Sequence, residues 1–100
     1  MTSEEIINYL SANKDVLKSY HVNRIGLFGS YSKGLQTAQS DIDLLVEYLP
    51  GKKSFDEFSA LIDTLENEFG KNVELVTRES TTPSFYEQIK HDLKYVQINY

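Results

Sequence analysis

The sequence of 100 residues contains no cysteine, which excludes disulfide bonds, thiolate zinc sites and thiol nucleophiles. No apolar run approaches the roughly 20 residues that a membrane-spanning helix needs. Internal repeats, low-complexity stretches and linkers rich in proline or glycine are also absent. The acidic start of the chain is unlike a signal peptide. We therefore expect a single domain over residues 1–100, a cytoplasmic location and no membrane partner.

Positive charge is scarce as well. Arg24 and Arg78 are the only arginines, the lysines are scattered, and the net charge is −5. Proteins that grip nucleic acids usually carry a basic stripe, because neutralising phosphates supplies most of the affinity. We therefore do not expect nucleic acid as the main partner. A metal-chelated nucleotide remains compatible, since the cation cancels phosphate charge and prefers carboxylate ligands.

Hydrophobic periodicity and capping signals predict alternating helices and strands. The first helix has a capping-box pattern at Thr2 and Glu5, and a break near Asn13 stays open. Residues 31–39 are polar and turn-rich, with room for one helical turn. The elements run helix, two strands, helix, strand, helix, strand, over residues 3–19, 24–28, 41–48, 54–69, 72–77, 83–91 and 94–98. This order favours an α/β (α+β) fold, in which helices pack on a small mixed sheet.

The helix over 54–69 has the clearest signals in the chain. Ser54 and Glu57 form a second capping box, and Gly70 is suited to end the helix. We expect its apolar stripe to be core: Phe55, Phe58, Leu61, Ile62, Leu65 and Phe69.

Two aspartates carry the most informative chemistry. Asp41 and Asp43 lie on the predicted strand 41–48, where residues i and i+2 share a face, while Ile42, Leu44 and Val46 face the core. Two carboxylates on one face repel each other unless a cation lies between them. A pair of metal ions about 3.5–4 Å apart would supply that cation and would clamp the oxygens of a phosphoryl transfer.

Such a site needs a third carboxylate from a neighbouring strand, and Glu74 is the best candidate. It alternates with the core residues Val73 and Leu75, so it lies on the opposite face from them. If its strand pairs beside the second strand, Glu74 stands next to Asp43. It would then complete the metal site or act as general base on an acceptor hydroxyl.

A glycine-rich segment precedes these carboxylates. Gly29 and Ser30 follow a predicted strand directly, where glycine lets the backbone approach a phosphate and the following amides can bind an anion. Gly34 would allow a tight return of the loop, and Lys33 could place one charge on a phosphate. Tyr31 could line the same site.

Gly-Ser, three residues, Gly, five residues and then Ser40-Asp41-Ile42-Asp43 resemble the signature of the nucleotidyltransferase superfamily that includes DNA polymerase beta. The length and layout resemble its smallest members, the minimal nucleotidyltransferases. The resemblance implies the polymerase beta-like fold and ATP as substrate. It also implies two Mg²⁺ ions held by Asp41, Asp43 and Glu74, and a nucleotide held by Gly29, Ser30, Lys33, Gly34 and Ser40. Lysine at position 33 and glutamate at position 74 depart from the arginine and aspartate that are common there.

Members of this size are often antitoxins paired with a HEPN-family ribonuclease toxin. The resemblance therefore implies transfer of AMP from ATP to a tyrosine of such a toxin. Two alternatives stay open: a small-molecule acceptor such as an antibiotic or sugar, and a non-catalytic antitoxin that neutralises by binding. So short a chain leaves one side of its site open, and a partner or a second copy in a homo-oligomer would close it. The acceptor, the number of nucleotides transferred, the nucleotide preference and the oligomeric state are not encoded in any recognisable pattern.

Overall fold

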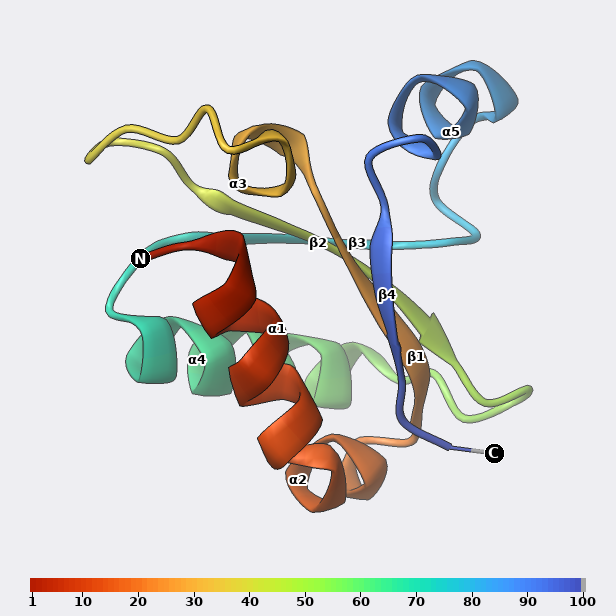
Figure 1. Cartoon of the computed structure of the whole chain (residues 1–100). Helices are drawn as coiled ribbons and strands as arrows, with labels where there is room; N and C mark the ends of the chain where they lie inside the picture. The colour runs from red at the N-terminus through yellow and green to blue at the C-terminus, as the bar shows by residue number, and fades with distance from the viewer. Residues whose placement is uncertain (100) are drawn as a thin grey trace.

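The computed structural model describes residues 1–99, which form a four-stranded sheet with helices on both faces (Figure 1). The strands lie in the order β3-β2-β1-β4. β1 pairs antiparallel with β2 and with β4, whereas β2 and β3 are parallel. The elements are α1 (Ser3–Ala12), α2 (Lys14–Ser19), β1 (Val22–Phe28), α3 (Gly29–Lys33), β2 (Ile42–Tyr48), α4 (Phe55–Phe69), β3 (Val73–Thr77), α5 (Pro83–Ile89) and β4 (Lys94–Gln97). The predicted mixed sheet with packed helices is confirmed.

The main core lies between one face of the sheet and the layer of α1, α2 and α4 (Figure 1). Ile42, Leu44 and Val46 of β2 are fully buried in it, as their alternation predicted. Leu45, on the opposite face, is equally buried, because Ile89 of α5 and its neighbours form a second apolar cluster there. The sequence of a central strand that is covered on both faces is typically a continuous apolar run. Within residues 1–99, no helix has the length and apolar character to cross a membrane.

The helix predicted over 3–19 is interrupted at Asn13. The backbone of Asn13 leaves the helical region at φ −116° and ψ 33°, and the Asn13 side-chain amide donates to the Tyr9 carbonyl at 2.9 Å. Asparagine competes in this way for backbone groups and so favours helix ends. The chain therefore forms α1 and α2 as separate helices, with the predicted capping box of Thr2 and Glu5 in place.

The ends of α4 and the start of α5 follow the sequence signals. Ser54 accepts a hydrogen bond from the Glu57 amide, but the Glu57 carboxylate contacts Nδ1 of His21 at 3.0 Å, so only half of the predicted capping box forms. Gly70 ends the helix with φ at 65°. Thr82 caps α5, and Pro83 occupies its first position. The helix stops at Ile89, two residues before the predicted end.

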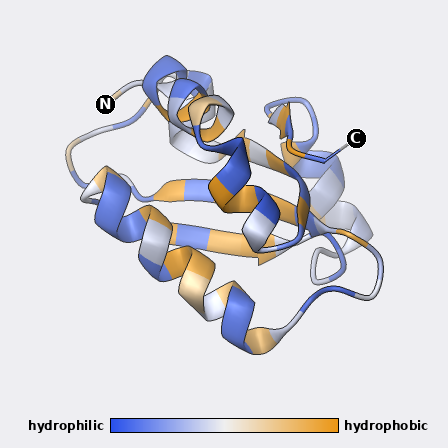
Figure 2. Cartoon of the chain, turned by 90° about the horizontal axis from the view of Figure 1, so that it is seen from below, coloured by the Kyte–Doolittle hydropathy of each residue, from blue (hydrophilic) through white to orange (hydrophobic). Residues whose placement is uncertain are grey.

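The first turn of α4 departs from the expected core stripe. Leu61 and Leu65 are at most 1% exposed, but Phe55 is 79% exposed. β3 is the last strand of the sheet, so no further strand extends the apolar surface beside this turn. Figure 2 shows hydrophobic colour at the surface where the loop from β2 enters α4. The prediction that Phe55 is a core residue is therefore wrong, because periodicity shows which residues share a face but not how far the sheet reaches.

Substitutions at Leu61 and Phe55, which belong to the same stripe, should change the free energy of unfolding by very different amounts. We expect Leu61→Ala to lower the free energy of unfolding by about 2–5 kcal/mol, since it leaves a cavity in the core. Phe55→Ala should change it by no more than about 0.5 kcal/mol, because the ring is already in solvent. Urea denaturation followed by circular dichroism measures both, and equal losses would contradict the assigned edge of the core.

Candidate active site

Asp43 and Glu74 lie side by side on parallel strands. The register of β2 and β3 pairs them directly, so their side chains project from neighbouring positions on one face of the sheet. Both residues alternate with core-facing neighbours, so their carboxyl groups are on the face of the sheet away from α4. The structure therefore brings together two of the three predicted carboxylates.

Asp41 lies just before β2 and is exposed. Its charge reaches Asp43, but within residues 1–99 no three side chains of His, Cys, Asp or Glu are grouped closely enough to hold a metal ion. Beside Asp41, a polar cavity of about 500 Å³ opens between the turn before β2 and the end of α4, with Ser40, Glu66 and Lys71 in its wall. The sequence contained no signal for this cavity, because its walls come from segments far apart in the chain.

Burial raises the pKa of Asp43 from 3.8 to about 6, and the charge of Glu74, its hydrogen bond and the charge of Asp41 add to this effect. Each of these causes disfavours the ionised form. At neutral pH the pair therefore carries an electrostatic cost that a cation between the two carboxylates would relieve.

Gly29, the first residue of α3, lies directly against Asp43. Its φ is 74°, and a Cβ atom at this position would be 2.1 Å from Oδ2 of Asp43. Only glycine accommodates both the left-handed conformation and this close approach. The first main-chain amides of α3 have no acceptor within the helix, so the backbone from Gly29 to Ser30 presents donors next to the carboxylate pair.

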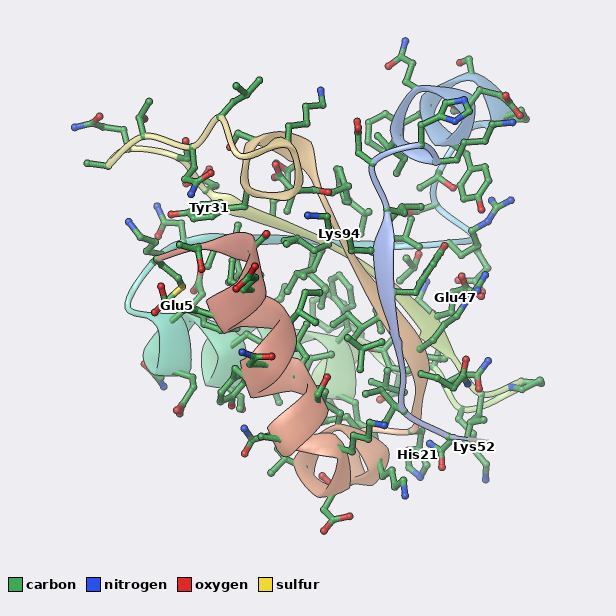
Figure 3. All side chains as sticks on the ribbon, viewed as in Figure 1. Glu5, His21, Tyr31, Glu47, Lys52 and Lys94 are labelled. Carbon is green, nitrogen blue, oxygen red and sulfur yellow. The ribbon has the colours of Figure 1, made fainter. Side chains whose placement is uncertain are left out.

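α3 itself differs from the expected loop. The helical turn begins at Gly29 instead of lying within 31–39, and residues after Gly34 are not helical. Tyr31 is 1% exposed and packs into the main core, so it does not line the site; Figure 3 shows it on the α1 side of α3. The hydroxyl of Ser32 donates to the Asp92 carbonyl. These tertiary contacts hold the turn, which local propensity alone would not stabilise.

Three predicted nucleotide-binding residues also have roles in the structure of the chain itself. The ammonium of Lys33 lies 3.6 Å from Oδ2 of Asp92, which follows α5. Gly34 ends α3 in the left-handed conformation with φ at 74°. The Ser40 hydroxyl accepts a hydrogen bond from the Thr37 amide at 2.9 Å and so closes the turn before β2. Their roles in nucleotide binding stay predictions, and the contribution of Asp92 had no sequence signal.

The sequence matches the nucleotidyltransferase domain family over residues 9–96, and the chain belongs to this family. By fold it is one of the minimal nucleotidyltransferases. A solved structure provisionally described as a minimal nucleotidyltransferase superimposes with a TM-score of 0.71 at 26% identity, covering 88% of this chain and 93% of that chain.

Two named proteins are similar to this chain over nearly its whole length. A Methanocaldococcus jannaschii protein, provisionally named protein adenylyltransferase MJ1379, is 43% identical over 98 residues, covering 95% of this chain and 98% of that protein. Protein adenylyltransferase MntA of Thermococcus cleftensis is 32% identical over 99 residues, covering 96% and 97%. A toxin–antitoxin crystal structure with AMP-PNP superimposes with a TM-score of 0.65 at 26% identity, covering 83% of this chain and 71% of that chain.

The raised pKa of Asp43 makes stability depend on pH. Because the folded protein binds this proton more tightly than the unfolded chain, the associated stability is present below about pH 4 and is lost as pH rises through about 6. We expect Asp43→Asn to stabilise the fold at pH 7.5 by about 1 kcal/mol, allowing for solvent screening of a half-exposed group. At pH 4 the gain should vanish. Urea denaturation at both pH values tests this, and a loss of stability at pH 7.5 would refute it.

The contact between Gly29 and Asp43 can be isolated with a matched glycine. Gly34 has the same φ of 74° but open space around it. We expect Gly34→Ala to cost about 1 kcal/mol from backbone strain alone, and Gly29→Ala to cost at least about 2 kcal/mol more, since the new methyl group overlaps a carboxylate. Adding Asp43→Ala should remove most of that difference in a double-mutant cycle. Equal costs for the two glycines would mean that the close approach is absent in solution.

Proposed function

We propose that this chain transfers AMP from ATP to a tyrosine hydroxyl of a HEPN-family toxin in a reaction that requires Mg²⁺, and so acts as an antitoxin. The observation that carries the proposal is the pairing of Asp43 with Glu74 on adjacent strands, directly against the backbone of Gly29. Like-charged carboxylates beside a glycine-lined helix start are suited to a metal-bound triphosphate. Support for a protein acceptor comes from the protein adenylyltransferase named among the relatives and from the toxin–antitoxin structure.

The carboxylates fit magnesium by their chemistry. Carboxylate oxygen is the ligand that Mg²⁺ prefers. Burial and then the charges of Glu74 and Asp41 raise the pKa of Asp43, and a bound cation would offset both effects. Magnesium is usually held by one or two carboxylates together with substrate phosphates, so a closed cage of protein ligands is not required. In the proposal, Asp41 and Asp43 hold the two ions together with the phosphates of ATP, and Glu74 serves as the general base. When bound, these ions neutralise charge on the phosphates and on the leaving group.

The remaining steps use the residues of the chain. The amides of Gly29 and Ser30 bind phosphate oxygens and orient the triphosphate. The acceptor oxygen forms a bond to the α-phosphorus while the bond from that phosphorus to the bridging oxygen breaks, and pyrophosphate leaves. Glu74, exposed on the edge strand, takes the hydroxyl proton. Lys33 can reach a phosphate only by leaving Asp92, which makes its contact conditional on nucleotide binding.

AMP transfer can be tested with α-labelled ATP, Mg²⁺ and a HEPN-family toxin as acceptor, taken from the neighbouring gene where that gene encodes one. We expect label on that protein, and Asp43→Asn should lower the rate on the order of 100-fold or more, because it removes charge at the reacting phosphate. Glu79→Gln makes the same chemical change on an exposed residue beyond β3 and should leave the rate unchanged.

Three outcomes would contradict the proposal. If the wild-type chain transfers no label, the proposed activity towards this acceptor is refuted. Equal label with Asp43→Asn would separate the activity from the carboxylate pair. Neutralisation of the toxin by a chain carrying both Asp41→Asn and Asp43→Asn would indicate an antitoxin that acts by contact alone.

A further inference from the structure

An apolar groove lies along the edge strand β3, on the face of the sheet opposite the carboxylate pair. It has a volume of about 540 Å³ and runs between the first turns of α4 and strand β3. Phe55 and Phe58 form one wall, and Leu75 and Val76 form the other. Phe55 exposes 79% of its surface here. Large apolar surface at a sheet edge is unusual for a free-standing domain and often marks a site of interaction.

The main chain of β3 is open at one position of this groove. Asn72 and Arg78 bond to β2, through the Asn72 carbonyl and the Arg78 amide. Because alternate residues of a parallel ladder face opposite neighbours, Val73, Leu75 and Thr77 turn their backbone groups to the free edge.

Both ends of that edge are already capped. The Val73 amide donates to Glu66 at 2.9 Å, and the Thr77 carbonyl accepts from the Ser80 amide at 3.2 Å. Leu75, in the middle, has no such cap within residues 1–99. Natural proteins block free edges in this way, so the gap at Leu75 is a position where a short extended segment can pair.

Pairing at Leu75 would connect the groove to the reaction site. Side chains of neighbouring strands that lie opposite each other share a face, and successive residues alternate between faces. A partner residue opposite Leu75 would therefore point into the groove between Phe55 and Phe58. The residue next to it in the partner would lie over Glu74, on the face that carries Asp43.

Charge at the mouth of the groove indicates the chemistry of the segment. Lys53 lines the groove, and Lys52 precedes it in the loop from β2 to α4 (Figure 3). Neither ammonium has an ion-pair or hydrogen-bond partner within residues 1–99. In a chain of net charge −5, the unpaired Lys53 beside an exposed phenylalanine complements an acidic side chain next to an apolar one.

We propose that this groove and the free edge of Leu75 bind an extended segment of the acceptor protein. That segment carries an aliphatic or aromatic anchor in the groove and an acidic residue at Lys53. The hydroxyl that receives AMP lies an odd number of positions, one or three, from the anchor. This inference rests on the proposed function for the identity of the acceptor, but binding to the groove does not require transfer of AMP.

Hydrogen exchange provides a test that is independent of catalysis. The chain is mixed with the HEPN-family protein without ATP, and amide exchange is followed by NMR. The Leu75 amide should exchange quickly in the free chain and at least tenfold more slowly in the complex. The Val76 amide, which faces β2, is the internal control and should be slow in both. A Leu75 amide whose exchange does not change on complex formation would overturn the proposal.

Kinetics with ATP and Mg²⁺ test the anchor and the lysines. Phe55→Ser, and separately Lys52→Glu with Lys53→Glu, should raise the KM for the acceptor protein about tenfold and leave kcat unchanged, because binding is lost but chemistry is not. Val16→Ser is the matched control: Val16 is 41% exposed on α2, away from the groove, and its variant should behave as wild type.

The outcomes separate the two proposals. Protection of Leu75 without any AMP transfer would keep the groove and refute the activity. Transfer with an unchanged KM for Phe55→Ser would keep the activity and refute the groove. A homodimer of the wild-type chain that Phe55→Ser converts to a monomer, seen by light scattering, would assign the groove to a second copy and overturn the proposal.

Discussion

The geometry of the site depends on the enforced proximity of two like-charged side chains, Asp43 and Glu74. The parallel register of β2 and β3 places them side by side, and the Asp43 carboxylate occupies the space that a side chain at position 29 would take. A buried apolar strand holds this arrangement, because β2 is packed on both faces and cannot shift its register without exposing its core residues. The fold thereby maintains an electrostatic cost at one point of its surface, which is typical of functional sites.

The two faces of the sheet have different roles: one face contains the main core, and the other contains the candidate site. The face covered by α1, α2 and α4 contains the main core, and it also contains Tyr31, which anchors α3 from below. The opposite face contains the carboxylates, the start of α3 and the small cluster under α5. At the edge of the sheet, β3 belongs to both regions, since Leu75 lies on the core face and Glu74 on the face of the site. An acceptor that binds this edge would therefore contact both.

Prediction from the sequence succeeded where short-range patterns carry the information. The caps at Ser54 and Thr82 and the alternation along β2 are local, and the fold confirmed them. It was wrong for Phe55 and Tyr31. Periodicity assigned Phe55 to the core, but the sheet ends before reaching it. Position in the motif suggested that Tyr31 lines the site, but its side chain points into the core.

By itself, the sequence determined the class of fold and the family, and it predicted which carboxylates form the site, because these follow from alternation and from a motif within about one strand and one turn. Only the tertiary structure decided how those residues meet. The pairing of Asp43 with Glu74 depends on strand order, the pairing of Lys33 with Asp92 on the position of α5, and the open edge at Leu75 on where the sheet stops. Contacts between residues distant in the chain are set by packing, and no local pattern encodes them.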